Sequence, residues 1–174
     1  MSTLETARLQ LRLLREERDG DVALYTDLYT DAAVMRHIAA PLAADAAAQA
    51  FARACRHNQA SRPGHRTWRV DGRTGGTALG IAALQRTGDV AEVGVILREG
   101  AWGHGLGREA IAAVLGHAFA IAGLALVYGE RPDDTQARLV DRMFAPLGLE
   151  RVTPPTPGLA RWELPRARWS GSPG

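Results

Sequence analysis

The sequence contains no lysine, because all 21 of its basic residues are arginine. A Walker A loop ends in Gly-Lys-Ser/Thr, so this class of nucleotide-binding site is excluded. The arginines occur along the whole chain, without a dense run or interleaved aromatic residues, which disfavours nucleic-acid binding. The formal net charge is only +2, and alanine is also abundant. We therefore interpret the missing lysine as coding bias.

Cysteine and long apolar runs are scarce too. Cys55 is the single cysteine, so the chain forms no internal disulfide. No segment reaches the roughly 20 consecutive apolar residues that cross a bilayer, and the opening residues carry no signal-peptide pattern. These absences predict a cytoplasmic protein with no membrane partner. We also expect no bound metal.

The 174 residues suffice for one domain with a sizeable core. A hydrophobic content of 46% and a charged content of 23% are ordinary for globular proteins. We expect residues 1–169 to form a single domain and residues 170–174, "SGSPG", to form a flexible tail.

The apolar pattern alternates between strand and helix periods along the chain. It predicts strands at residues 8–14, 67–70, 77–84, 90–97, 124–130 and 159–164. Helical spacing covers residues 21–29, 31–38, 45–59, 107–123 and 134–144, with Asp45 expected as the N-cap of its helix. The order is strand, helices, three strands, helix, strand, helix, strand. This order predicts a mixed α/β domain.

A glycine-rich loop, "GHGLG", joins the strand at 90–97 to the helix at 107–123. Gly103, Gly105 and Gly107 leave the backbone bare just before a helix N-terminus, which is a typical cradle for an anion. The dinucleotide fingerprint G-x-G-x-x-G is not met, because the spacing is G-x-G-x-G. The remaining candidate is the pyrophosphate of coenzyme A, with a tight turn that binds nothing as the alternative.

The stretch "AEVGVILREGAWGHGLGREAIAAVLGHAF" resembles the cofactor-binding core of the GNAT superfamily of N-acetyltransferases. It is most similar to the RimJ/RimL branch, which acetylates the N-termini of ribosomal proteins. "LETARLQLRLL", "ALYTDLYTDAAVMRHI" and "WELPRARW" also resemble segments of that branch. The resemblance implies the GNAT fold, an α/β (α+β) fold with a mixed, mostly antiparallel sheet. Helices flank this sheet, which is splayed between its fourth and fifth strands, where acetyl-CoA binds as cosubstrate.

The resemblance also implies which residues bind the cofactor. Backbone amides wrap the pyrophosphate, and the backbone of Ile96 and Leu97 pairs with the pantetheine arm and lies near the oxyanion. Trp102 replaces the Gln or Arg that begins the loop in much of the superfamily. The segment "DTQA" departs from the frequent Asn-x-x-Ser pattern, but Asp134 is expected to contact the cofactor through its backbone or a water. The amides expected at the pyrophosphate are those of Gly103, His104, Gly105, Leu106, Gly107 and Arg108.

Glu92 is the candidate general base, since it matches the glutamate of the family's "E-I-G-Y" run. The alternative is a solvated strand carboxylate paired with an arginine. The tyrosine that often protonates the thiolate in this superfamily has no counterpart, because Phe144 cannot donate a proton. The general acid is therefore unassigned and water is a candidate.

The acceptor is the least determined feature. An α-amine with a pKa near 8 needs only about 1 kcal/mol to be neutral at pH 7, whereas a lysine amine needs about 4.6 kcal/mol. A site with one modest base therefore favours the α-amine of a protein or peptide N-terminus, attacked directly. Alternatives are a small amine (an antibiotic, polyamine or amino acid) and a non-catalytic acyl-CoA-binding module. The branch also implies a homodimer.

Overall fold

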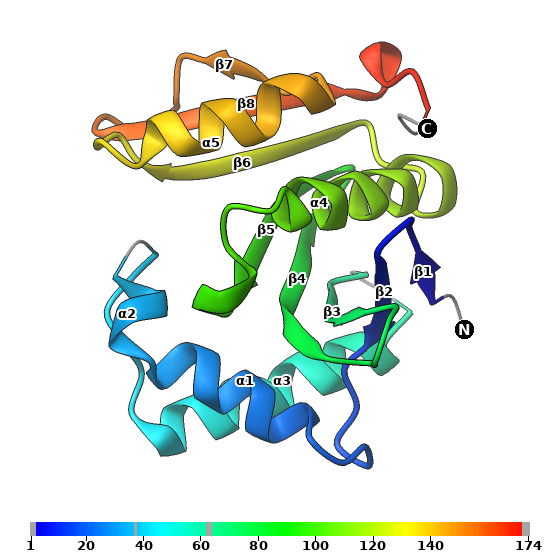
Figure 1. Ribbon diagram of the computed structural model, residues 1–174. Helices are drawn as coiled ribbons and strands as arrows, with labels where there is room; N and C mark the ends of the chain where they lie inside the picture. Colours follow the sequence, from blue (N-terminus) through cyan, green and yellow to red (C-terminus); the bar gives the residue numbers. More distant parts are fainter. Residues whose placement is uncertain (1–2, 37, 62–63, 172–174) are drawn as a thin grey trace.

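The computed structural model describes residues 3–36, 38–61 and 64–171. They form one eight-stranded sheet with the strand order β1-β2-β3-β4-β5-β6-β8-β7 and with helices on both faces (Figure 1). Strands β5 and β6 are parallel, and the other neighbouring pairs are antiparallel. The predicted fold class, a mixed and mostly antiparallel sheet flanked by helices, is confirmed.

The strands are β1 (Leu4–Glu5), β2 (Leu9–Leu13), β3 (Arg66–Gly72), β4 (Ala78–Thr87), β5 (Val90–Leu97), β6 (Leu126–Pro132), β7 (Glu150–Val152) and β8 (Leu159–Pro165). The helices are α1 (Asp21–Thr30), α2 (Ala32–Met35), α3 (Ala44–Gln59), α4 (Leu106–Gly116) and α5 (Ala137–Phe144). Helix α4 continues as a π-helical turn over His117–Ile121.

Three details differ from the sequence prediction. Strands β1 and β7 were not predicted, because segments of two and three residues are too short to carry a period-two pattern. Asp45 is not the N-cap of α3: the helix begins at Ala44, and Asp45 accepts a hydrogen bond from the N–H of Ala46 inside the first turn. The remaining predicted strands and helices are present, with boundaries shifted by a few residues.

The sheet separates two apolar cores, because alternate side chains of each strand point to opposite faces. On β5, Val93 and Val95 pack with α4, whereas Ile96 packs on the face covered by α1 and α3 (Figure 1). Trp68 and Phe119 are fully buried in the core beneath α4. Leu24, Phe51 and Ile81 are among the buried residues of the core beneath α1 and α3.

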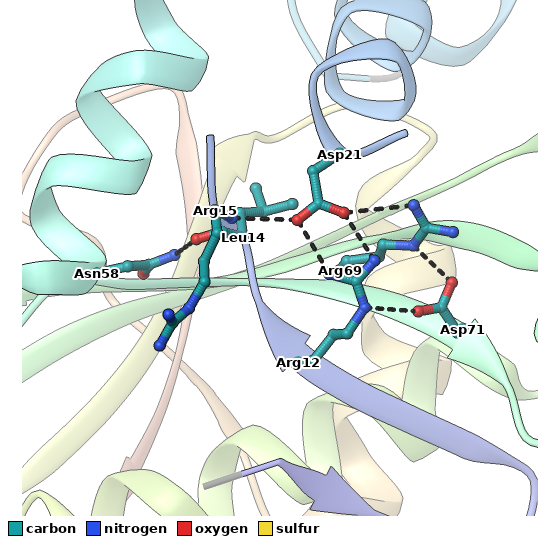
Figure 2. Close-up of polar contacts among 7 residues, drawn as sticks. All are labelled: Arg12, Leu14, Arg15, Asp21, Asn58, Arg69 and Asp71. Carbon is teal, nitrogen blue, oxygen red and sulfur yellow. Dashed lines mark hydrogen bonds and ion pairs between the residues drawn. The ribbon is translucent and has the colours of Figure 1, made fainter. Parts of the chain in front are cut away.

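A buried ionic network anchors the start of α1 to the sheet (Figure 2). Asp21 is fully buried and accepts hydrogen bonds from the guanidinium of Arg12 at 2.7 and 3.0 Å and from the backbone N–H of Arg15 at 3.1 Å. Arg69 lies 3.3 Å from the same carboxylate and 2.6 Å from Asp71. A buried carboxylate is tolerated when its charge is paired in this way. The network sets the position of α1 over β2 and β3.

Within residues 3–36, 38–61 and 64–171, no helix is long and apolar enough to cross a membrane. In the same part of the chain, no three side chains of the His, Cys, Asp or Glu type come together as a metal site. Residues 172–174, which belong to the predicted tail, lie outside the described residues.

Candidate functional site

The parallel strands β5 and β6 pair over three residues and then separate. Their register joins Val90 to Leu126, Ala91 to Val127 and Glu92 to Tyr128. Beyond Glu92, the remaining residues of β5 continue to pair with β4 alone. Strands β5 and β6 are the fourth and fifth of the strands predicted from the sequence. This opening between them is therefore the splay that the resemblance implies.

The ladder with β4 determines which backbone groups of β5 face the splay. The N–H of Arg98 donates to the carbonyl of Leu79 at 2.8 Å, and hydrogen-bonded pairs recur at every second residue of an antiparallel ladder. The backbone groups of Ile96 are therefore directed to β4, so its expected pairing with the pantetheine arm does not fit this register, whereas the backbone groups of Val95 and Leu97 face the splay. The indole N–H of Trp102 already donates to the carbonyl of Leu97 at 2.8 Å. Val95, which the sequence analysis did not single out, thus has both backbone groups directed to the opening.

A cavity of about 320 Å³ lies between β5 and α5, and we call it the thioester cavity. Its lining is mostly apolar and includes the predicted residues Ile96 and Leu97. The other lining residues are Val34, Ile38, Val95, Trp102, Arg131, Gln136, Leu139, Val140 and Met143. A narrow apolar cavity beside exposed strand edges fits an extended arm that carries amide groups, as pantetheine does.

The glycine loop leads directly into α4. Gly103 and Gly105 have φ angles of +78° and +73°, a backbone region in which a side chain is strained. Gly105 is the N-cap residue, and no side chain of the described residues caps the helix. The N–H groups of Leu106, Gly107 and Arg108 therefore have no partner within the helix. They are available to an anion, as predicted for pyrophosphate.

Arg8, which precedes β2, fastens the glycine loop to the N-terminal segment. Its guanidinium donates to Glu109 at 2.6 Å and to the backbone carbonyl of His104 at 2.9 Å. Burial opposes ionisation of Glu109, but hydrogen bonds from Thr6 and Arg8 lower its pKa below the ordinary value. Arg8 and Arg108 line one cavity beside Gly105. No local pattern pointed to Arg8, because its contacts with the loop join residues 101 and 96 positions apart in the chain.

A second cavity, of about 210 Å³, lies on the opposite face of β5, and we call it the acceptor cavity. Glu92, Gly94 and Glu130 line it, together with Tyr29 of α1. It shares Ile38, Val95 and Ile96 with the thioester cavity, so the two cavities meet at the splay. An acceptor amine and a thioester would meet at this junction.

The side-chain carboxylate of Glu92 makes no hydrogen bond or ion pair with any residue that the structure describes. Burial raises the pKa of its carboxyl group, the nearby Glu130 raises it further, and Arg161 partly opposes both effects. The arginine pairs elsewhere: Arg161 lies 3.2 Å from Glu130 and 2.7 Å from Glu163. The alternative of an arginine-paired strand carboxylate therefore does not describe Glu92.

Two other predicted features lie at α5. Asp134 is exposed and shapes the turn before α5, where it accepts hydrogen bonds from Arg131 at 3.1 Å and from the N–H of Gln136 at 2.9 Å. Its contact with the cofactor stays a prediction, although both of these partners line the thioester cavity. Phe144 is buried against Gly129, where an added Cβ would lie 2.4 Å from the ring.

A protein family and several solved structures are similar to this chain. A family model described as an acetyltransferase (GNAT) domain matches residues 8–152. A search of the curated proteins gives no match. The RimJ/RimL branch is not distinguished by these findings.

Solved structures share the fold at low sequence identity. An acetyltransferase from Agrobacterium tumefaciens superposes with a TM-score of 0.78 at 21% identity, covering 94% of each chain. A GNAT-family acetyltransferase from Bacillus anthracis gives 0.76 at 14% identity, covering 95% of this chain and 99% of the other. A spermidine N-acetyltransferase from Vibrio cholerae, solved with CoA and spermine, gives 0.76 at 15% identity, covering 94% and 98%.

Proposed function

Because the chain belongs to the GNAT family of acetyltransferases, we propose that it acetylates the α-amine of a protein or peptide N-terminus by direct attack. It is an acetyl-CoA-dependent N-acetyltransferase. The observation that carries the proposed mechanism is the junction of the thioester and acceptor cavities, which share Ile38, Val95 and Ile96. Glu92 lies in the acceptor cavity beside this junction without a partner of its own among the described residues.

The residues around the splay fit acetyl-CoA, which supplies the acetyl thioester when bound. The amides of the loop from Gly103 to Arg108 would hold the pyrophosphate, assisted by the positive end of α4. Arg8 and Arg108 would add positive charge at the same place. The apolar lining of the thioester cavity would enclose the pantetheine arm, and the exposed backbone of Val95 would pair with it.

Glu92 would accept a proton from the attacking amine, directly or through one water. The raised pKa of its carboxyl group suits this role, because a base is most effective when its pKa lies near the working pH. The N–H groups of Val95 and Leu97 face the splay and would stabilise the developing oxyanion. No side chain is assigned as the acid for the departing thiolate, and water would supply that proton.

The choice of an α-amine rests on the low cost of deprotonating it near neutral pH and on the resemblance to the RimJ/RimL branch. A small cationic amine is the second candidate. Glu92 and Glu130 make the acceptor cavity negative, and the Vibrio cholerae neighbour is a spermidine acetyltransferase. The proposal also includes a contact between Asp134 and the cofactor, and the assembly of two copies of the chain into a homodimer.

An acceptor panel tests the proposed function. Release of free CoA from acetyl-CoA would be measured with three acceptors. The first is a peptide with a free N-terminus. The second is the same peptide blocked at its N-terminus and carrying one lysine, and the third is spermidine. We expect acetylation of the free peptide and little of the blocked one. Spermidine as the best acceptor would establish the second candidate. Acetyl-CoA binding without turnover of any amine would favour a non-catalytic module.

A further inference from the structure

A third cavity, of about 270 Å³, lies between the helices α1 and α3 and the strands β3 and β4, and we call it the α3 cavity. It shares Tyr29, Ala83 and Gln85 with the acceptor cavity. The two cavities are therefore neighbours on the same face of the sheet, and together we call them the cleft. Its far end lies away from the splay, beside Arg53, His57 and His65.

The two ends of this cleft carry opposite charge. The acceptor cavity is lined by Glu92, whose carboxylate has no described partner, and by Glu130, which pairs with Arg161 at 3.2 Å. The α3 cavity is lined by Arg53 and two histidines and by no described acidic residue. The guanidinium of Arg53 makes no hydrogen bond or ion pair with a described side chain, so no described acid neutralises its charge.

The histidines add hydrogen-bond donors to the same end. The Nδ1 atom of His65 accepts a hydrogen bond from the backbone N–H of Arg86 at 2.8 Å. A neutral imidazole that accepts at one nitrogen carries its proton on the other, so Nε2–H is the donor that remains. Burial lowers the pKa of His65, and His57 and Arg66 lower it further, which favours this neutral form. The edge of His57 packs against the ring of His65 with centroids 4.7 Å apart.

The cationic end belongs to a fixed part of the fold. Asn58 at the end of α3 donates to the carbonyls of Leu14 at 3.0 Å and Thr67 at 2.8 Å (the bond to Leu14 is drawn in Figure 2). Its side-chain oxygen accepts from the N–H of Thr67 at 2.8 Å. These three bonds hold the C-terminal half of α3, which carries the exposed side chains of Arg53 and His57, against β2 and β3.

The sheet register gives the length of the cleft. Thr67 of β3 lies opposite Ala83 of β4, and Ala83 lies opposite Gly94 of β5. Two steps between strands of about 4.8 Å each separate β3, which lies beneath the α3 cavity, from β5, which lies beneath the acceptor cavity, by about 10 Å. An extended peptide covers that distance in about three residues.

We propose that the acceptor is an amine that carries a carboxylate about 10 Å away, with the amine at Glu92 and the carboxylate at Arg53 and His65. This inference rests on the proposed function and specifies its substrate class. The carboxylate comes from the C-terminus of a short peptide or from an acidic side chain near the N-terminus of a longer one. A polyamine is disfavoured, because one of its cations would lie beside Arg53.

The test compares acceptors of matched length. Trialanine with a free carboxylate, trialanine amide, an amidated Ala-Ala-Asp peptide and spermidine would be assayed for kcat/KM with saturating acetyl-CoA. We expect trialanine or the Asp peptide to exceed trialanine amide about tenfold, which is the size of one hydrogen-bonded charge pair. Whichever of the two is better identifies the source of the carboxylate.

Two arginine variants on one helix complete the experiment. Arg53→Gln should reduce the preferred acidic acceptor to the level of trialanine amide and leave the amide unchanged. Arg56→Gln is the matched control, since Arg56 is exposed on α3 and outside the cavity lining. Equal rates for acid and amide in the wild type, an unchanged preference in Arg53→Gln, or a preference for spermidine would overturn the inference while the acetyltransferase activity stands. Failure to acetylate any amine would overturn the proposed function, and the inference with it.

Discussion

Glu92 of β5 lies directly opposite Tyr128 of β6, and this pair is the last one that joins the two strands. The carboxylate that we assign as the base thus lies at the vertex of the splay, where the paired part of the sheet ends. Beyond Glu92 the edge of β5 is open, and the thioester and acceptor cavities meet further along the strand, at Val95 and Ile96. The local geometry therefore places the partly buried carboxyl group of Glu92 beside the open backbone edge of β5.

Substitution of Glu92 should separate catalysis from cofactor binding. Glu92→Gln keeps the size of the side chain but cannot accept a proton, so we expect kcat to fall about 10²- to 10⁴-fold. The dissociation constant for acetyl-CoA should be unchanged, because the carboxylate lies outside the glycine loop. In the wild type, kcat/KM should fall at acid pH with an apparent pKa above that of an ordinary glutamate.

The control for this variant is Glu99→Gln, a change at an exposed position near the loop. It should retain wild-type kcat. Full activity of Glu92→Gln would show that Glu92 is not the base and would leave water or another group in that role.

Although Glu92→Gln should lower the activity, it should raise the stability of the folded protein at neutral pH. The pKa of Glu92 is raised in the folded protein, so ionisation is costlier in the folded state than in the unfolded state. Stability is therefore lost as pH rises from the ordinary carboxyl pKa through the raised one. Glu92→Gln should raise the Tm at pH 7 and have little effect below pH 4, where the carboxyl is protonated in both states. Thermal melts at both pH values measure this, and a lower Tm for the variant at pH 7 would contradict it.

The glycine loop permits a matched pair of variants. Gly103 and Gly88 both have a positive φ, at +78° and +62°, and an added Cβ would meet nothing within 4 Å at either position. Gly103→Ala and Gly88→Ala should each cost about 1–2 kcal/mol of stability from backbone strain. Weaker acetyl-CoA binding is expected for Gly103→Ala alone, by about tenfold or more, because Gly88 lies in the β4–β5 hairpin. Calorimetry on both variants gives the comparison, and equal affinities would argue against a cradle at this loop.

Removal of the buried acid in the network at the start of α1 should destabilise the protein more than removal of an exposed acid. Asp21→Asn removes the charge that pairs with Arg12 and Arg69, so we expect a loss of about 3–5 kcal/mol in the free energy of unfolding. Asp27→Asn, in an exposed pair with Arg98, should cost about 1 kcal/mol or less. Urea titrations at pH 7 compare the two, and similar small losses would mean that the buried network does not anchor α1.

The parts of the fold that the sequence predicted are those with local signals. The alternation in β2 and β5, the amphipathic helix α4 and the bare glycine loop each depend on neighbours within about 15 residues, so a periodic pattern records them. The loop conformation was equally predictable, since Gly103 and Gly105 adopt φ angles that few other residues tolerate.

The parts that escaped prediction depend on distant pairing. Arg8 contacts Glu109 and the carbonyl of His104 across about a hundred residues, and no local pattern signals such a contact. Val95 became a candidate only when the register with β4 showed which backbone groups face the splay. The cationic end formed by Arg53 and His65 likewise needs α3 to lie across β3. Propensity and spacing carry none of this information.

The central claim is that the opening between β5 and β6, with its glycine loop, binds acetyl-CoA. Isothermal titration of the purified protein with acetyl-CoA, with NAD as the control, tests it most directly. The account predicts saturable binding of acetyl-CoA that free CoA competes away, and no binding of NAD. Absence of acetyl-CoA binding, or equal binding of NAD, would contradict the claim and reduce the loop to a tight turn between strand and helix.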